Sequence, residues 1–127
     1  MITKLLLVLK RWALPLVIIY AIALTIGSLM HLKDMPSLGS SFDDKIYHLV
    51  AYIIFTFLVY NFCVTKKYSK VIFISAITVT IYGIIIEVLQ FVLTSHRTFD
   101  FYDALANASG AIFAAVLLKY QHKLKLN

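Results

Sequence analysis

The chain has 127 residues, of which 61% are hydrophobic and only 14% are charged, and its mean hydropathy is +0.88. Soluble domains carry about 25% charged residues, so this composition excludes an ordinary soluble domain and predicts an all-α integral membrane protein. The single cysteine, Cys63, excludes an intrachain disulfide and a cysteine-based zinc site. The length allows one membrane domain over residues 1–127 and no second domain.

Charged residues divide the chain into four apolar segments, which we interpret as a bundle of four transmembrane helices. The segment after Arg11 follows basic residues, as in a signal peptide, but it is too long for a cleaved one and we predict a retained helix. Pro15 lies in its first turn, where a missing N–H does no damage. The fourth segment is short, and we expect it to extend backwards through Phe99. The four predicted helices cover residues 12–30, 46–65, 71–95 and 104–118.

The basic residues indicate how the helices are oriented. Nine of the 12 Lys and Arg residues lie in the N-terminal segment, in the 66–70 connection and in the 119–125 segment. Only Lys33, Lys45 and Arg97 lie elsewhere. Because basic loops stay in the cytoplasm, we predict that both termini are cytoplasmic and that the loops 32–44 and 95–103 are external. The positive charge is therefore a topology signal, and we predict no nucleic-acid partner.

Polar residues recur at the same spacing on three of the predicted helices. Members spaced i, i+4, i+7 lie on one helix face, and polar groups inside a membrane are costly and mark function by default. Each set lies toward the external end of its helix, so we predict one polar pocket that opens to the outer leaflet or the exterior and is roofed by Arg97 and Asp100. The sets are Asp44, His48 and Ala51; Gly83, Glu87 and Gln90; and Asp103, Asn107 and Gly110.

Each of these residues also has a purely structural interpretation. Glu87 is a candidate ion-pair partner of Arg97, Lys45 or His48, because buried charges are rarely left unpaired. Asp103 is a candidate N-cap of the last helix. Amide and imidazole side chains join neighbouring helices in lipid, and glycines let helices approach closely. The first of these two roles is open to His48, Gln90 and Asn107, and the second to Gly83 and Gly110. Tyr52 is a candidate pocket hydroxyl.

Three blocks of the sequence resemble the VanZ-like family, which is named for a teicoplanin-resistance protein. Residues 44–52 are similar to its D-K-x-x-H-x-x-x-Y pattern and residues 83–90 to its G-x-x-x-E-x-x-Q pattern. Arg97 and residues 103–110 are similar to its R…D-x-x-x-N-x-x-G pattern, so the resemblance covers residues 44–110. The family often has a further glycine after the third block, where this chain has Ala111 to Ala115.

The resemblance implies a small bacterial protein of the inner (plasma) membrane with a role in the cell envelope and in glycopeptide resistance. We predict a non-enzymatic factor whose pocket binds a lipid-linked cell-wall precursor or another anionic headgroup. Arg97 and Lys45 would hold the anion. The expected partner is thus membrane lipid, and the formation of a homo-oligomer is left open as an alternative. The predicted ligand-binding residues are Asp44, Lys45, His48, Tyr52, Glu87, Gln90, Arg97, Asp100, Asp103 and Asn107.

Two other functions stay open at this point. An intramembrane enzyme acting on a lipid-linked substrate would use His48 or Glu87 as its acid or base. A structural membrane subunit would use the same polar residues only to hold its helices together. We predict no metal and no cofactor, although Asp44, Glu87 and Asp103 offer the oxygen ligands of a hard cation.

Overall fold

The computed structural model describes residues 2–29, 43–93 and 101–126, and it is all-helical over these ranges. The prediction of an all-α chain is therefore confirmed for the described part. The five helices are α1 (Ile2–Arg11), α2 (Ala13–Leu29), α3 (Asp43–Thr65), α4 (Val71–Leu93) and α5 (Phe101–Leu126).

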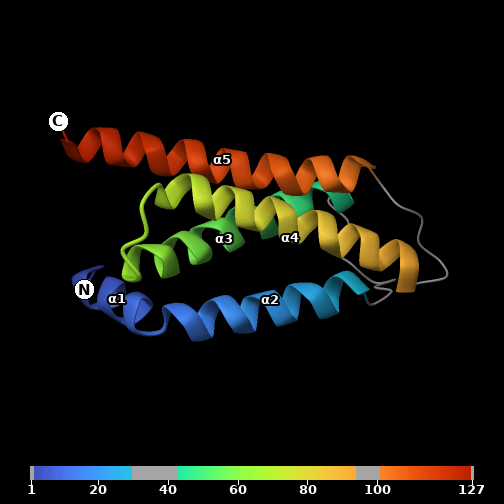
Figure 1. Cartoon of the computed structure of the whole chain (residues 1–127), viewed down its shortest axis with the longest axis horizontal. Helices are drawn as coiled ribbons and strands as arrows, with labels where there is room; N and C mark the ends of the chain where they lie inside the picture. Colours follow the sequence, from blue (N-terminus) through green and yellow to red (C-terminus); the bar gives the residue numbers. More distant parts are fainter. Residues whose placement is uncertain (1, 30–42, 94–100, 127) are drawn as a thin grey trace.

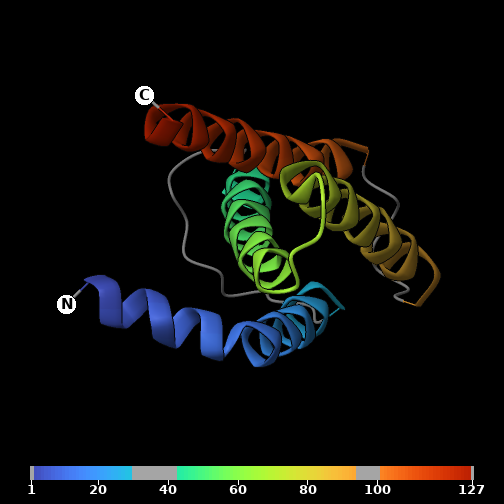
Figure 2. The ribbon, with the colours of Figure 1, turned by 60° about the vertical axis from the view of Figure 1, so that its left-hand side comes forward.

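The four longer helices form a bundle in which α3 is central. In the rotated view, α3 stands between α2 on one side and α5 on the other, and α4 flanks it (Figure 2). Helices α3 and α4 each contact all three other long helices. The start of α1 and the end of α5 lie at the same end of the bundle (Figure 1). The opposite end holds the start of α3, the end of α4 and the start of α5 (Figure 1).

Three helices are long and apolar enough to cross a membrane: Lys45–Thr65, Val71–Leu93 and Phe101–Leu124. Their outward faces carry large apolar side chains that water would not solvate well, among them Ile54, Ile85 and Phe113. Such faces are expected where the surrounding solvent is lipid, so the structure describes a membrane-embedded protein.

The N-terminal region differs from the prediction, because an additional helix precedes the first predicted span. Helices α1 and α2 are bent by 72° at a break, and only together are they long and apolar enough to cross a membrane. The break lies at Trp12. The ring of Pro15 clashes with a helical carbonyl four residues earlier, at Arg11, and lacks the N–H that would bond it. Pro15 lies in the first turn of α2, as predicted, but the helix upstream gives its ring a carbonyl to clash with.

The helix ends also differ from the predicted span limits. Helix α3 begins at Asp43, three residues before the predicted start, and α5 continues to Leu126, well beyond residue 118. Charged residues end a membrane span but not a helix, and residues 119–126 contain no glycine or proline that would stop one. The backward extension of α5 reaches Phe101, and Phe99 lies outside the described residues.

Hydroxyl groups of two tyrosines attach α2 to the rest of the bundle. Tyr20 donates a hydrogen bond from its hydroxyl to the Ala51 carbonyl of α3 at 2.7 Å. Tyr82 of α4 donates in the same way to the Ala21 carbonyl of α2, also at 2.7 Å. The rings of both tyrosines pack on Phe55, with centroids 5.5 Å and 5.0 Å away. This aromatic layer fixes the level at which α2 meets α3 and α4.

The short connection between α3 and α4 is closed by a left-handed residue. Lys67 has φ 57°, and its N–H bonds the Val64 carbonyl while the Tyr68 N–H bonds the Cys63 carbonyl. This is the hydrogen-bond pattern of a Schellman cap, in which glycine is the usual left-handed residue. Lys70, the residue before α4, also has a positive φ of 53°. The chain therefore reverses direction within a few residues and places α4 antiparallel to α3.

Candidate polar site

The polar residues of α4 and α5 lie on the buried stripes of these helices. Gly83, Glu87 and Gln90 are buried on α4, and Asp103, Asn107 and Gly110 are buried on α5. On α3, His48 and Ala51 are partly buried, while nothing is described of the Asp44 side chain. These residues come from the start of α3, the second half of α4 and the start of α5, toward the bundle end that lies opposite to the termini (Figure 1).

Asp103 is the centre of the charge network at this end. Its Oδ1 lies 2.5 Å from the Lys45 ammonium, and its Oδ2 lies 3.8 Å from His48 Nε2. The other ring nitrogen of His48, Nδ1, lies 2.9 Å from the Asn107 side-chain oxygen. The Asp103 side chain is only 5% exposed, whereas that of Lys45 is 27% exposed. Residues of α3 and α5 thus form an ion-pair and hydrogen-bond network that links the two helices.

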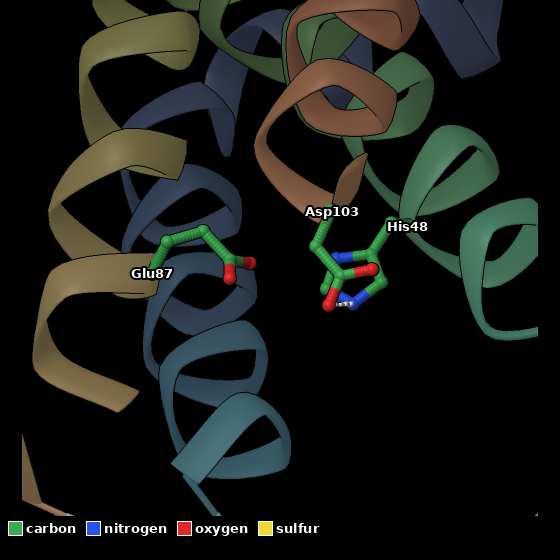
Figure 3. A group of neighbouring side chains, drawn as sticks. All are labelled: His48, Glu87 and Asp103. Atoms are coloured by element: carbon green, nitrogen blue, oxygen red, sulfur yellow. Dashed lines mark ion pairs between the residues drawn. The ribbon is translucent and has the colours of Figure 1, made fainter. Parts of the chain in front are cut away.

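Glu87 approaches the same network from α4. Figure 3 shows its carboxylate extending from α4 toward Asp103 and His48. One side-chain atom from each of these three residues lies within 4.8 Å of the other two. Glu87 is 1% exposed and Asp103 is 3% exposed. Two carboxyl groups held this close inside an apolar bundle are costly unless cations or protons accompany them, and such an arrangement marks a functional site by default.

Two neutral polar groups beside the carboxylates have no hydrogen-bond partner among the described residues. They are the Tyr52 hydroxyl and the Asn107 side-chain nitrogen, and both residues are 1% exposed. The two side chains meet over Gly83, where a methyl group would lie 3.0 Å from the Tyr52 ring and 3.0 Å from Asn107 Cβ. A buried donor without a partner costs about 1–3 kcal/mol, so both groups are exceptions in a packed core.

Gln90 forms a hydrogen bond with α2, which lies outside the three helices that carry the polar sets. Its side-chain nitrogen donates to the Ser28 carbonyl of α2 at 2.6 Å. This bond agrees with the interhelical interpretation of Gln90, because it joins α4 to α2 rather than to α3 or α5. Arg97 and Asp100, the predicted roof, lie outside the described residues.

The side chains around Asp103 meet the needs of a metal ion only in part. His48, Glu87 and Asp103 offer one nitrogen and two carboxylates, which suit a divalent cation in chemical type. The Lys45 ammonium lies 2.5 Å from Asp103 Oδ1, however, so a cation already balances that oxygen. A metal would have to displace this lysine or bind through Oδ2, which faces His48. The arrangement therefore fits an ion-pair network better than a metal centre.

The sequence interpretation missed a second polar cluster, which lies between α2 and α4. The Thr25 hydroxyl contacts the Tyr82 hydroxyl and donates to the Ala21 carbonyl at 2.8 Å. Together with Tyr20 and Ser28, these residues attach α2 to the helices that hold the carboxylates. A signal for this cluster exists in the sequence, because a tyrosine in the middle of an apolar span needs a partner for its hydroxyl.

The family comparison agrees with the three blocks identified above. The VanZ/LLP1 family matches residues 9–122, which is most of the chain. The chain belongs to the VanZ/LLP1 family. No curated protein and no solved structure matched it.

The VanZ-like blocks supply all the ionisable side chains that the structure describes in this network. The first block supplies Lys45 and His48, the second supplies Glu87, and the third supplies Asp103. These residues are separated by up to 58 positions in the sequence, yet they meet in one place. The pattern through which the chain resembles the VanZ-like family therefore corresponds to a three-dimensional cluster.

Proposed function

We propose that the chain crosses the plasma membrane four times, with both termini in the cytoplasm. The bent pair α1 and α2 would form the first span, because only together do these helices have the required length and hydropathy. The three basic segments then lie on the cytoplasmic side, as the positive-inside rule requires. In this orientation the network around Asp103 lies toward the exterior.

The external network is proposed to bind an anionic headgroup, such as that of a lipid-linked cell-wall precursor, without catalysing a reaction. The observation that carries this proposal is the meeting of Lys45, His48, Glu87 and Asp103 from three helices inside an apolar bundle. Residues that only held the helices together would need fewer charges, because burying a charge costs desolvation free energy. Membership in the VanZ/LLP1 family supports a role in the cell envelope and in the response to glycopeptides.

The predicted pocket residues then take different roles, which for the described side chains rest on their contacts. Lys45, which is partly exposed, and Arg97 hold the anion, while Asp103 and Glu87 fix these cations. Tyr52 and Asn107 contribute the hydroxyl and amide donors that lack a partner in the described part of the chain. His48 orients Asn107 and Asp103. Asp44 and Asp100 are assigned to the rim, while Gln90 attaches α4 to α2.

The second candidate is an intramembrane enzyme with a carboxylate as its acid or base. The observation that favours it is the short separation of Glu87, Asp103 and His48, since closely spaced titratable groups exchange protons readily. The contacts of His48 argue against its use as the general base. One ring nitrogen faces an oxygen of Asn107 and the other faces an oxygen of Asp103. Neither nitrogen is directed toward a substrate, so an enzyme of this kind would depend on Glu87.

The test is the sensitivity of a glycopeptide-susceptible bacterium that expresses the chain. We expect the wild type to raise the inhibitory concentration of teicoplanin, and Glu87→Gln, Arg97→Ala and Asp103→Asn to abolish the increase at matched membrane abundance. Asp34→Asn is the matched control, because it removes a carboxylate predicted to lie on the same side of the membrane but outside the pocket. Vancomycin is measured in parallel.

Three results would contradict the proposal in different ways. If the wild type is abundant and changes neither inhibitory concentration, the resistance role fails for this protein in that host. If Asp34→Asn acts like the pocket variants, the effect reports overall charge rather than a pocket. If Glu87→Gln abolishes the phenotype while co-purified lipid is retained, the enzyme is favoured over the binding protein, since binding and phenotype then separate.

A further inference from the structure

A concave surface lies between α4 and α5, at the end of the bundle that carries the termini. It encloses about 600 Å³ and is formed by the first two turns of α4 and the second half of α5. Its lining is apolar from Ile112 to Val116 on α5 and from Val71 to Ala76 on α4. Lys70, Lys119 and His122 complete the lining where it approaches the terminal end.

The lysines at this end of the groove have no acidic counterpart in the parts of α4 and α5 that form it. Residues 45–86 and 104–127 contain no Asp and no Glu, so Lys70 and Lys119 face no carboxylate side chain from α4's first half or from α5 beyond Asp103. Both lysines are exposed. An ammonium pair above an apolar groove is complementary to a molecule with an anionic head and an apolar chain.

His122 adds a directed polar group to the rim. Its Nε2 is in hydrogen-bond contact with the Tyr60 hydroxyl of α3, and the two rings meet edge to face with centroids 5.9 Å apart. When the hydroxyl donates to Nε2, the proton of the neutral imidazole is on Nδ1, which can then donate to an anionic oxygen. The contact with Tyr60 holds the ring in position beside Lys119.

The dimensions of the groove match one leaflet of the membrane. From Ile112 to His122 a helix rises about 15 Å, which is half of the roughly 30 Å hydrocarbon core. An acyl chain of a phospholipid in this groove would fill the same depth, with its phosphate near Lys70 and Lys119, which line one end of it. We propose that this groove is a specific site for an anionic phospholipid of the leaflet next to the termini.

This site is separate from the external network, and the two proposals fail independently. The groove takes no residue from the cluster of His48, Glu87 and Asp103. Arg97→Ala is therefore expected to leave phospholipid binding in the groove unchanged, whatever it does to glycopeptide sensitivity. If Arg97→Ala removes the bound phospholipid and the groove variants do not, the lipid belongs to the external pocket and the groove proposal is wrong.

The experiment is native mass spectrometry of the full chain in detergent, titrated with phosphatidylglycerol or with phosphatidylcholine of the same acyl chains. We expect phosphatidylglycerol to bind the wild type more tightly. Lys70→Ala combined with Lys119→Ala should lower that affinity about 25-fold, from roughly fivefold per lysine, and should remove the preference over phosphatidylcholine. Lys66→Ala combined with Lys67→Ala is the matched control, since it removes the same charge from residues outside the groove.

A third variant tests the apolar part of the groove without changing charge. Ala76→Phe places a large ring in the groove and should weaken the binding of both phospholipids, whereas Ile77→Phe, on an exposed position beside it, should not. Equal affinity of the wild type for the two phospholipids would overturn the proposal. Equal losses in the two double-lysine variants would also overturn it, because they would show that only the overall charge attracts lipid.

Discussion

Gly110 shows how one residue sets the distance between two helices. A methyl group at this position would lie 2.6 Å from the Leu49 carbonyl oxygen and 3.2 Å from the Ile53 nitrogen, both in the backbone of α3. Backbone atoms of a packed helix cannot move aside as a flexible side chain can. The close approach of α5 to α3 therefore requires glycine here, and it brings Asn107 within hydrogen-bond distance of His48.

Gly110→Ala should destabilise the bundle by about 1–3 kcal/mol, because the added methyl group forces α5 away from α3. Gly27→Ala is the matched control, since nothing lies within 4 Å of the corresponding methyl position on α2. Both substitutions raise the helix propensity of their residue, so the difference in stability between the two variants reports the clash of the Gly110→Ala methyl group with α3. The measurement is thermal unfolding in detergent, and a Gly110→Ala protein as stable as the Gly27→Ala protein would show that the helices are not in close contact.

At the scale of elements, the bend between α1 and α2 is the feature that the sequence interpretation missed. The run of apolar residues locates a span between Arg11 and Met30, but it does not show that residues 2–11 are also helical. Helix α1 contains no acidic residue and ends in Lys10 and Arg11, an arrangement that favours a helix C-terminus. The Asn61 side chain of α3 donates to the Leu9 carbonyl at 2.9 Å, which attaches α1 to the bundle.

Pro15→Ala should reduce the bend, because alanine removes the ring clash at the Arg11 carbonyl and restores the N–H. Spin labels on Ile2→Cys and Ile26→Cys, both exposed positions, in a Cys63→Ala protein report the change by pulsed electron resonance. In one continuous helix the two sites would be separated by about 36 Å along the axis. We expect the distance to increase by several ångströms, and an unchanged distance would assign the bend to the Asn61 contact instead.

For the whole molecule, the main consequence of the fold is an asymmetry between its two ends. Buried acidic residues and the VanZ-like network occupy one end, whereas the lysine-rich connection and the α5 C-terminal half occupy the other (Figure 1). In the proposed topology, the hydrocarbon core of the membrane separates these two ends. The proposed orientation assigns the network to the exterior and the lysine-rich end to the cytoplasm.

Single-cysteine labelling tests this orientation, because Cys63 is the only natural cysteine and is buried. In a Cys63→Ala background, Ser40→Cys should react with a membrane-impermeant maleimide in intact spheroplasts, and Ser69→Cys should react only after permeabilisation. Labelling of Thr3→Cys distinguishes a topology with four membrane spans from one with three. It should be protected if α1 and α2 cross the membrane together, and labelling of Thr3→Cys from outside would mean that they do not.

Local properties of the sequence determined the class of this protein and most of its elements. Hydropathy and the 3.6-residue period depend only on neighbouring residues, so the apolar helices α3, α4 and α5 and the polar faces of α4 and α5 were predictable. The three VanZ-like blocks were recognisable for the same reason. Helix ends were less predictable, because the charges used to limit the spans do not stop a helix.

Only the tertiary structure decided which polar groups meet. Spacing assigned Gln90 to the same set as Glu87, yet Gln90 bonds α2 while Glu87 faces Asp103 and His48. The pairing of Lys45 with Asp103 and the burial of the Tyr52 hydroxyl likewise depend on how far apart α3, α4 and α5 lie. Those distances follow from contacts at Gly83 and Gly110 between residues remote in the chain, and a periodic pattern within one helix contains no information about them.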